Sequence, residues 1–332
     1  MKPLRGKVAL VAGATRGAGR GIARALGEAG ATVYCSGRST RQHAATPGRK
    51  ETIDDTAEMV TALGGTGIAA QTDHTRPEQV SRLIDRIEKE QGRLDILVND
   101  IWGGDSWIDW WFKVTKFWEI PLEKGFEVMN TAVNSHIITA HQAIPLMIRT
   151  KKGLIVEITD GDGFYYRGQF YYDYVKTTVM RLAMAWGYEL RKKKIAAAAI
   201  TPGFLRSESI LDQFHVTEAN WRDAVKGRPE FAHSETPLYV GRAIAGLAAD
   251  PNVMKKSSRV FNSAELAMEY GVTDADGTRP NIWQFFREKM PQFAFKKLDD
   301  TFYSYFENVN YEAFEAEVKK EVRRAARKPT SS

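Results

Sequence analysis

Short apolar segments alternate with longer segments of helical periodicity along most of this chain, and this alternation constrains its fold more than any other feature. The predicted strands are residues 7–12, 32–36, 67–73, 94–99, 153–159, 195–201 and 259–262. The helices predicted between them are 17–30, 51–63, 77–91, 123–149, 171–193 and 238–249. Strands and helices in this order form βαβ units with right-handed crossovers, so we expect an α/β fold with a parallel sheet covered on both faces. Such a sheet binds ligands beyond the carboxyl ends of its strands, where the strand order reverses.

Composition narrows the functional classes. The chain has 332 residues, 43% hydrophobic and 27% charged, which excludes a wholly disordered or coiled-coil protein. Its longest apolar runs are far shorter than the ~20 residues that cross a bilayer, and its start lacks a secretion signal, so we expect a cytoplasmic protein without a membrane partner. A single cysteine, Cys35, excludes an internal disulfide and fits a reducing compartment. The net charge of +6 suits an anionic small ligand but does not indicate nucleic acid.

A glycine-rich turn follows the first predicted strand and opens the first helix. Its glycines let a diphosphate approach the exposed N–H groups and the positive end of the helix dipole. The alternative is an ordinary strand–helix turn, but the position after a strand and before a helix favours a dinucleotide. The turn residues expected to contact that cofactor are Gly13, Thr15, Arg16, Gly17, Ala18 and Gly19.

The end of the second strand favours NADP over NAD. An acidic residue that would bind the ribose hydroxyls of NAD is absent there, and the chain has Ser36, Gly37, Arg38 and Ser39 instead. The planar guanidinium of Arg38 suits a 2′-phosphate, with Arg16 on the neighbouring turn. The alternative is that both arginines are solvated surface residues.

Polar residues end the third and fourth strands. Asp73 and Asn99 are expected at the adenine side of the cofactor, although each is equally compatible with a strand-end cap or turn. His74 is expected at the cofactor edge or on the surface. The six histidines show no zinc-ligand spacing, so no metal site is predicted.

Tyr172 and Lys176 begin a long helix and lie one turn apart, on the same face. A nearby ammonium lowers the pKa of a tyrosine from about 10, which makes Tyr172 a candidate acid/base for a carbonyl–alcohol couple.

Together these motifs resemble those of the short-chain dehydrogenase/reductase (SDR) family over residues 5–262. The matching elements, in family order, are Gly13-xxx-Gly17-x-Gly19, Asp73, Asn99, Tyr172-xxx-Lys176 and Pro202-Gly203. More loosely, the chain resembles the branch of dehydrogenase/reductase SDR family member one, in residues 36–38, 94–99, 249–253 and 269–277.

The resemblance implies a doubly wound, seven-stranded Rossmann sheet of order 3-2-1-4-5-6-7 and hydride transfer between NAD(P) and a carbonyl or alcohol. It implies that Tyr172 is the acid/base and that Lys176 binds the nicotinamide ribose. It also places Asp73 at the adenine, Asn99 in the sheet beside the cofactor, and Pro202 and Gly203 at the nicotinamide.

The chain departs from the family pattern in the active site. Asn99 is followed by Asp100, Ala132 aligns with the catalytic asparagine, and Asp160 aligns with the catalytic serine. An ionised Asp160 would repel a developing oxyanion and raise the pKa of Tyr172. Three alternatives stay open: a protonated Asp160 donates to the substrate, Thr159 supplies a hydroxyl instead, or Asp160 pairs with Lys176 and the site is inactive. Adjacent strand residues face opposite ways, so only one of the first two applies.

Aromatic residues concentrate in 102–118, near the expected mouth of the site, and predict a bulky or hydrophobic substrate. The candidate pocket residues are Trp102, Trp107 and Phe164. We expect one NADP-binding domain at 1–263, with a lid at about 205–236. A helical extension at 264–332 is expected to pack on it and to end in frayed residues. By resemblance, 123–149 and 171–193 are expected to form a homo-dimer or homo-tetramer.

The sequence therefore predicts an NADP(H)-dependent oxidoreductase that reduces the carbonyl, or oxidises the alcohol, of a small molecule. The alternative hypothesis is an NADP(H)-binding sensor or partner-binding protein with impaired catalysis, because Asp160 and Ala132 replace the family serine and asparagine.

Overall fold

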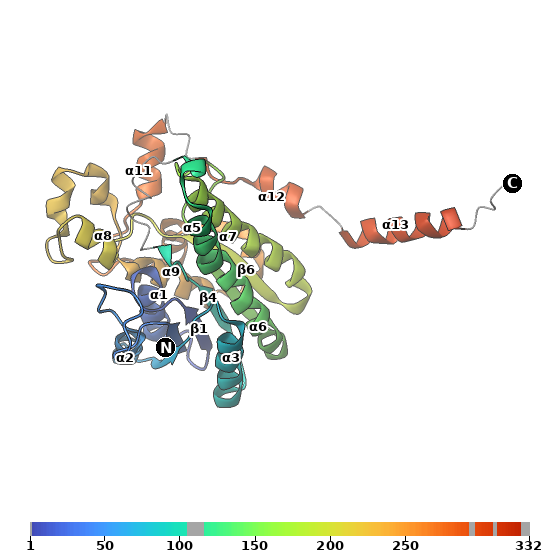
Figure 1. The fold of residues 1–332 in the computed structure, drawn as a ribbon, viewed down its shortest axis with the longest axis horizontal. Coiled ribbons are helices and arrows are strands. Elements are labelled where there is room, and N and C mark those ends of the chain that lie inside the picture. The colour runs from blue at the N-terminus through green and yellow to red at the C-terminus, as the bar shows by residue number, and fades with distance from the viewer. Residues whose placement is uncertain (1, 105–115, 292–295, 308–310, 327–332) are drawn as a thin grey trace. The chain divides into compact units, whose positions relative to one another are not determined.

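The computed structural model describes residues 2–104, 116–291, 296–307 and 311–326, and its centre is a seven-stranded parallel sheet (Figure 1). The strands are β1 (Val8–Ala12), β2 (Thr32–Gly37), β3 (Thr66–Gln71), β4 (Ile96–Asn99), β5 (Gly153–Ile158), β6 (Ile195–Thr201) and β7 (Arg259–Asn262). Their order is β3-β2-β1-β4-β5-β6-β7, which confirms the expected Rossmann topology. The order reverses between β1 and β4, so a crevice is expected there, at the carboxyl ends of the strands.

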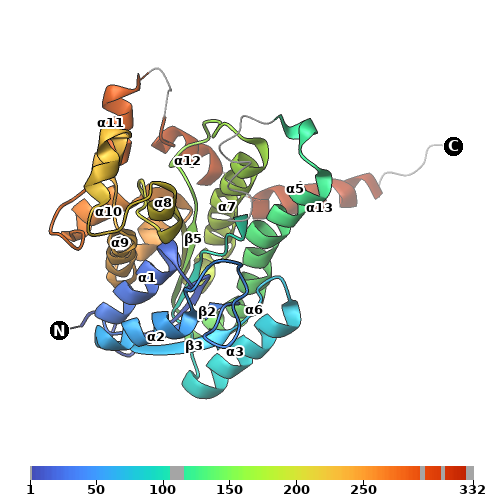
Figure 2. The same ribbon diagram turned by 60° about the vertical axis from the view of Figure 1, so that its left-hand side comes forward.

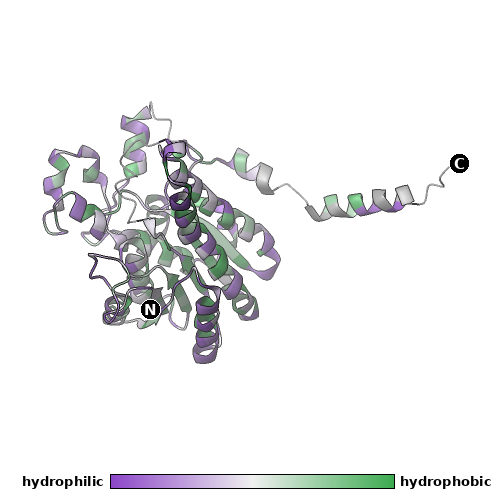
Figure 3. Cartoon of the chain, viewed as in Figure 1, coloured by the Kyte–Doolittle hydropathy of each residue, from purple (hydrophilic) through white to green (hydrophobic). Residues whose placement is uncertain are grey.

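Two sets of helices cover the sheet (Figure 2). The helices of the first compact unit are α1 (Gly17–Glu28), α2 (Ile53–Ala62), α3 (Pro77–Gln91), α5 (Leu122–Met129), α6 (Ser135–Thr150), α7 (Phe170–Glu189), α8 (Glu208–Gln213), α9 (Pro237–Ala249), α10 (Ser263–Tyr270) and α11 (Ile282–Lys289). Side chains alternate along β1: Ala9 and Val11 pack with α1 and α9, whereas Val8 and Leu10 pack with α3 and α6. The strands are hydrophobic and α3 is largely hydrophilic (Figure 3), as expected for a sheet buried on both faces.

The helix predicted at 123–149 is divided in the structure. A π-helical turn, Asn130–Asn134, joins α5 to α6, and Ala132 is buried within it. Such turns often occur at functional sites because they shift the register of the side chains that follow. The side chain of Thr131, in the same turn, lines the cavity described below.

The first compact unit is Met1–Lys296 and the second is Lys297–Ser332. The first therefore includes α10 and α11 and continues past residue 263, where the sequence analysis divides the chain. The second contains α12 (Asp300–Glu307) and α13 (Tyr311–Ala326); its packing on the first stays a prediction. Among the described residues, no helix has the length and apolar character needed to cross a membrane.

Candidate active site

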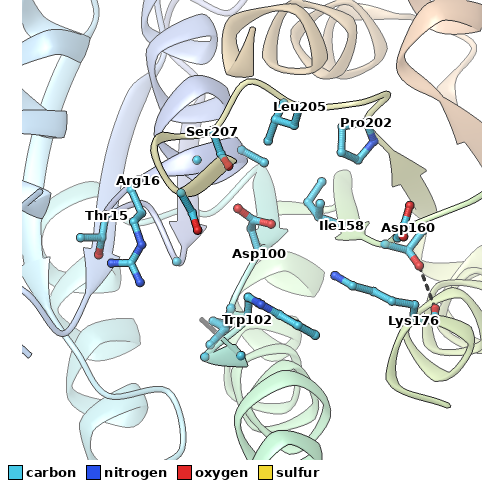
Figure 4. A pocket seen from close by; sticks show the side chains of 18 of the residues that line it. Thr15, Arg16, Asp100, Trp102, Ile158, Asp160, Lys176, Pro202, Leu205 and Ser207 are labelled. Carbon is cyan, nitrogen blue, oxygen red and sulfur yellow. Dashed lines mark hydrogen bonds between the residues drawn. The ribbon is translucent and has the colours of Figure 1, made fainter. Parts of the chain in front are cut away.

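A cavity of about 640 Å³ lies at the carboxyl ends of the strands, where the strand order reverses (Figure 4). Its wall comes from the turn after β1, the ends of β2 and β5, the loop after β4, the start of α7 and the segment after β6. Ile282, Trp283 and Phe286 of α11 add an apolar wall. The predicted cofactor residues that line the cavity are Gly13, Thr15, Arg16, Gly17, Ala18, Gly37, Arg38, Ser39, Asp73, His74, Tyr172, Lys176, Pro202 and Gly203.

The glycine-rich turn needs its glycines for two different reasons. Gly13 has φ +93°, and a Cβ there would lie 2.4 Å from the carbonyl oxygen of Asp100. Gly19 does not line the cavity; a Cβ on it would lie 2.3 Å from the carbonyl oxygen of Gly13, so its glycine is required for packing of the turn. The N–H of Gly17, at the start of α1, donates to the carboxylate of Glu208 at 2.8 Å. The turn thus binds an anionic group through a backbone N–H. A site for the diphosphate of a dinucleotide needs the same ability to bind an anion.

The end of β2 carries cations and no carboxylate. Arg38 is exposed and Arg16 is partly buried, and both line the same cavity. The Ser39 hydroxyl accepts a hydrogen bond from the Ala45 N–H at 3.2 Å, which holds the loop after β2. Arg38, at the position where NAD-binding proteins have an acid, and Arg16, on the turn after β1, could together hold the 2′-phosphate of NADP.

Asp73 accepts hydrogen bonds from the backbone N–H and the hydroxyl of Thr75, at 3.0 and 2.7 Å. Burial by itself would raise the pKa of Asp73, but these bonds and the charge of Arg38 hold it below its usual value. Asp73 is therefore an ionised acceptor at the cavity edge.

Ser36 and His74 point into the protein interior. The Ser36 hydroxyl is 2.8 Å from His74 Nε2 and 3.2 Å from the carbonyl oxygen of Val11, and it does not line the cavity. His74 Nδ1 lies 2.8 Å from the Thr139 hydroxyl. Burial lowers the pKa of His74 to about 3, so the ring is neutral. The surface placement considered for His74 is wrong, because its ring joins two hydroxyls inside the protein.

Asn99 also lies beneath the cavity and does not line it. Its amide donates to Glu157 Oε1 at 2.6 Å, and Glu157 Oε2 is 2.6 Å from His136 Nδ1. His136 Nε2 is 3.0 Å from the carbonyl oxygen of Ile101. This buried network holds the loop after β4, which carries Trp102. Sequence reasoning missed Glu157 and His136, although an acid inside an apolar strand is a detectable signal.

Tyr172, Lys176 and Asp160 all line the cavity, and Figure 4 shows Lys176 and Asp160 on the same side of it. The Tyr172 hydroxyl donates to Asp160 Oδ2 at 2.6 Å. Lys176 Nζ lies 4.4 Å from the ring centroid of Trp102 and 5.8 Å from that of Tyr172. Trp102 and Tyr172 meet edge to face, with centroids 5.5 Å apart.

The electrostatics of this cluster differ from the expectation. Burial, followed by the charge and hydrogen bond of Asp160, raises the pKa of Tyr172 well above its usual value. Burial lowers the pKa of Lys176, although Asp160 and Asp100 oppose this shift. The expected lowering of the Tyr172 pKa by Lys176 is therefore wrong in this structure, because burial and the Asp160 carboxylate both raise this pKa, the latter as expected for an ionised Asp160.

Thr159 and Asp160 take different directions, as neighbouring strand residues must. The Thr159 hydroxyl donates to the carbonyl oxygen of Lys176 at 2.7 Å, so it is used in packing against α7. Asp160, in contrast, contacts Tyr172. In the part of the chain that the structure describes, no ion pair joins Asp160 to Lys176, so the inactive pairing expected as a third alternative is not observed.

Arg167 positions Asp160 and was missed by sequence reasoning. Its side chain is buried and pairs with Asp173 at 2.8 Å. Its Nε donates to the backbone carbonyl of Asp160 at 2.5 Å, and its Nη2 to that of Gly163 at 2.8 Å. The guanidinium thus holds the loop between β5 and α7.

The predicted substrate residues have separate outcomes. Trp102 lines the cavity, whereas Phe164 is exposed and does not. Trp107 lies outside the described residues. Sequence reasoning did not find the wall formed by α11, where the Trp283 indole donates to the carbonyl oxygen of Pro202 at 3.3 Å.

Comparison with known proteins defines the class. A family model described as short chain dehydrogenase matches residues 7–215. Mouse (Mus musculus) dehydrogenase/reductase SDR family member 1 is 33% identical over 280 residues, which cover 83% of this chain and 85% of that protein. The chain belongs to the short-chain dehydrogenase family and is similar to this branch of it. Membership makes it an oxidoreductase of this class, with a nicotinamide cofactor and a small-molecule substrate.

More distant relatives share the fold. A 7alpha-hydroxysteroid dehydrogenase from Clostridium sardiniense is 26% identical over 251 residues, covering 75% of this chain and 89% of that protein. The crystal structure of a short chain dehydrogenase from Mycobacterium thermoresistibile has a TM-score of 0.67 at 19% identity, covering 84% of this chain and 95% of that one.

Proposed function

We propose that this protein is an NADP(H)-dependent oxidoreductase that reduces the carbonyl, or oxidises the alcohol, of a bulky or hydrophobic small molecule. The observation that carries the proposal is a single cavity with the glycine turn, Arg16 and Arg38 at one end and Tyr172 and Lys176 at the other. Its substrate end is apolar, with Trp102 and the aromatic residues of α11. The hydroxysteroid named for one relative is a substrate of this bulky, apolar kind.

The cofactor supplies or accepts a hydride when bound. The residues that would hold it are the glycine turn for the diphosphate, Arg16 and Arg38 for the 2′-phosphate, and Lys176 for the nicotinamide ribose. Tyr172 donates its phenolic proton to the product oxygen during reduction and accepts it during oxidation. The apolar walls exclude water from the reacting carbon.

Asp160 has to be reconciled with this role, because it accepts a hydrogen bond from the phenolic hydroxyl that Tyr172 would use to protonate the product oxygen. An ionised Asp160 opposes a developing oxyanion, whereas a protonated one donates to it. We propose that turnover uses the protonated carboxyl and that Thr159 has a packing role. The hydrogen bond from the Thr159 hydroxyl to the carbonyl oxygen of Lys176 supports the packing role, and the contact of Asp160 with Tyr172 supports a role of Asp160 beside the reacting group.

Substituting Tyr172→Phe tests the proposal. The phenylalanine keeps the ring beside Trp102 but removes the proton donor, so we expect substrate-dependent NADPH oxidation to fall at least ~100-fold. The measurement is initial rates over a panel of apolar ketones and aldehydes, with NADPH binding measured in parallel. Unchanged rates in the variant would exclude Tyr172 as the acid/base.

The second candidate function is that of an NADP(H)-binding protein with impaired catalysis. The hydrogen bond from Tyr172 to Asp160 favours it, because that bond uses the phenolic proton within the protein. Tight NADPH binding without turnover of any panel member would support this candidate.

Two further assignments are proposals. From the family resemblance we infer a homo-dimer or homo-tetramer built through α5–α6 and α7, which light scattering tests. From the single cysteine, Cys35, which fits a reducing compartment, we infer a cytoplasmic location, which fractionation tests.

A further inference from the structure

A carboxylate of this chain lies against the N-terminus of α1. Glu208 Oε2 accepts a hydrogen bond from the Gly17 N–H at 2.8 Å. Glu208 Oε1 is 3.5 Å from Arg20 Nη1. The first N–H groups of a helix have no partner within it and carry the positive end of its dipole, so an anion is stabilised there.

The same N–H group belongs to the glycine turn that would bind the diphosphate of a dinucleotide. Gly17 and Ser207 both line the cavity, and a Cβ placed on Gly17 would lie 3.8 Å from Ser207 Cβ. The close-up view shows Ser207 beside this turn (Figure 4). One N–H group cannot bind two anions at once, and two anions so close repel each other.

The segment that carries Glu208 contacts two other parts of the cavity wall, the start of α1 and the loop after β2. Glu208 begins the short helix α8, and the Ser207 hydroxyl caps it by accepting from the Ile210 N–H. Near its end, Asp212 pairs with Arg49 Nη1 at 2.5 Å. Arg49 lies on the loop after β2, so α8 bridges this loop and the start of α1.

We propose that Glu208 occupies the diphosphate position in the cofactor-free protein and must leave it before the cofactor binds. This inference rests on the proposed dinucleotide binding. The apparent affinity is then reduced by the fraction of molecules in which Glu208 holds the turn. Glu208 therefore sets cofactor affinity without contributing to the chemical step, and α8 moves when the dinucleotide enters.

The experiment compares Glu208→Gln with the wild type in a fluorescence titration with NADPH at fixed ionic strength. Glutamine keeps the size of the side chain but removes the charge that competes with phosphate, so we expect Kd to decrease about fivefold or more. Adenosine 2′-phosphate, which lacks the diphosphate, is expected to bind equally to both proteins. Glu123→Gln on the exposed face of α5 is the matched control for net charge and is expected to leave both values unchanged.

Glu208→Ala provides a second variant, because it removes the carboxylate and its hydrogen bond together. Unchanged or weaker NADPH binding in both variants, with tight binding in the wild type, would overturn the inference. An equal gain for adenosine 2′-phosphate would also overturn it, since the effect would then be general electrostatics. If no nicotinamide dinucleotide binds to any of the proteins, the proposed function fails and the inference fails with it.

Discussion

At the scale of single residues, burial and the hydrogen-bond partners of the ionisable groups in the cavity determine the pKa values and positions of these groups. Asp160, which the family resemblance aligns with a serine, accepts a hydrogen bond from Tyr172 on its side chain and one from Arg167 on its backbone carbonyl. The result is a phenol with a raised pKa rather than a lowered one. We infer that substrate and cofactor must change this arrangement before Tyr172 transfers a proton.

Arg38 provides the residue-scale test of cofactor choice. Arg38→Ala removes a guanidinium that would bind the 2′-phosphate, so we expect NADPH affinity to fall about tenfold or more, with NADH affinity changed less than about twofold. Titrations with both cofactors measure this difference. Arg82→Ala, on the exposed part of α3 and outside the cavity, is the matched control. An equal loss for both cofactors would contradict the 2′-phosphate assignment.

At the scale of secondary-structure elements, buried side-chain hydrogen bonds join elements that are far apart in the sequence. His74 follows β3 and joins Ser36 at the end of β2 to Thr139 on α6. His136 and Glu157 similarly join α6 and β5 to the loop after β4. These contacts set the loop ends that surround the cavity.

The neutral state of His74 predicts a pH dependence of stability. Its pKa is lowered to about 3 in the folded protein and returns to about 6.5 on unfolding, so the unfolded state binds one more proton between these values. We therefore expect the free energy of unfolding to fall as pH decreases below about 6.5, by up to about 1.4 kcal/mol per pH unit from this group. Urea unfolding between pH 4 and 7 measures the slope.

His74→Asn should flatten this acid limb of the stability profile, because asparagine does not titrate. His43→Asn removes an exposed histidine instead and should leave the slope unchanged. The same slope in the wild type and in His74→Asn would show that other groups cause the acid sensitivity.

At the scale of the whole molecule, the first compact unit contains the complete described cavity. All residues that line the cavity lie at or before Phe286, and the unit ends at Lys296. The two hydrophobic clusters that cover the sheet also lie within it. The unit thus has its own core and its own site.

A chain that ends at Lys296 is therefore expected to fold cooperatively and to bind NADPH with a Kd within about threefold of the full chain. Thermal unfolding and the fluorescence titration measure these properties. Loss of either would show that residues 297–332 are required for the first unit or its site.

The sequence by itself determined the alternation of strands and helices, the glycine turn and the pair Tyr172 and Lys176, because these depend on short-range periodicity and spacing. The strand order was expected only from the resemblance to the short-chain dehydrogenase/reductase family. The sequence also located Asp160 as a departure from the family pattern. The sequence left open whether Asp160 or Thr159 faces the substrate. The answer depends on the direction of the two side chains, which only the tertiary structure decided. The contact of Glu208 with the α1 turn joins residues 191 positions apart, and α11 reaches the cavity from still further along the chain. Local pattern carries no information on such contacts, since packing of the complete chain creates them.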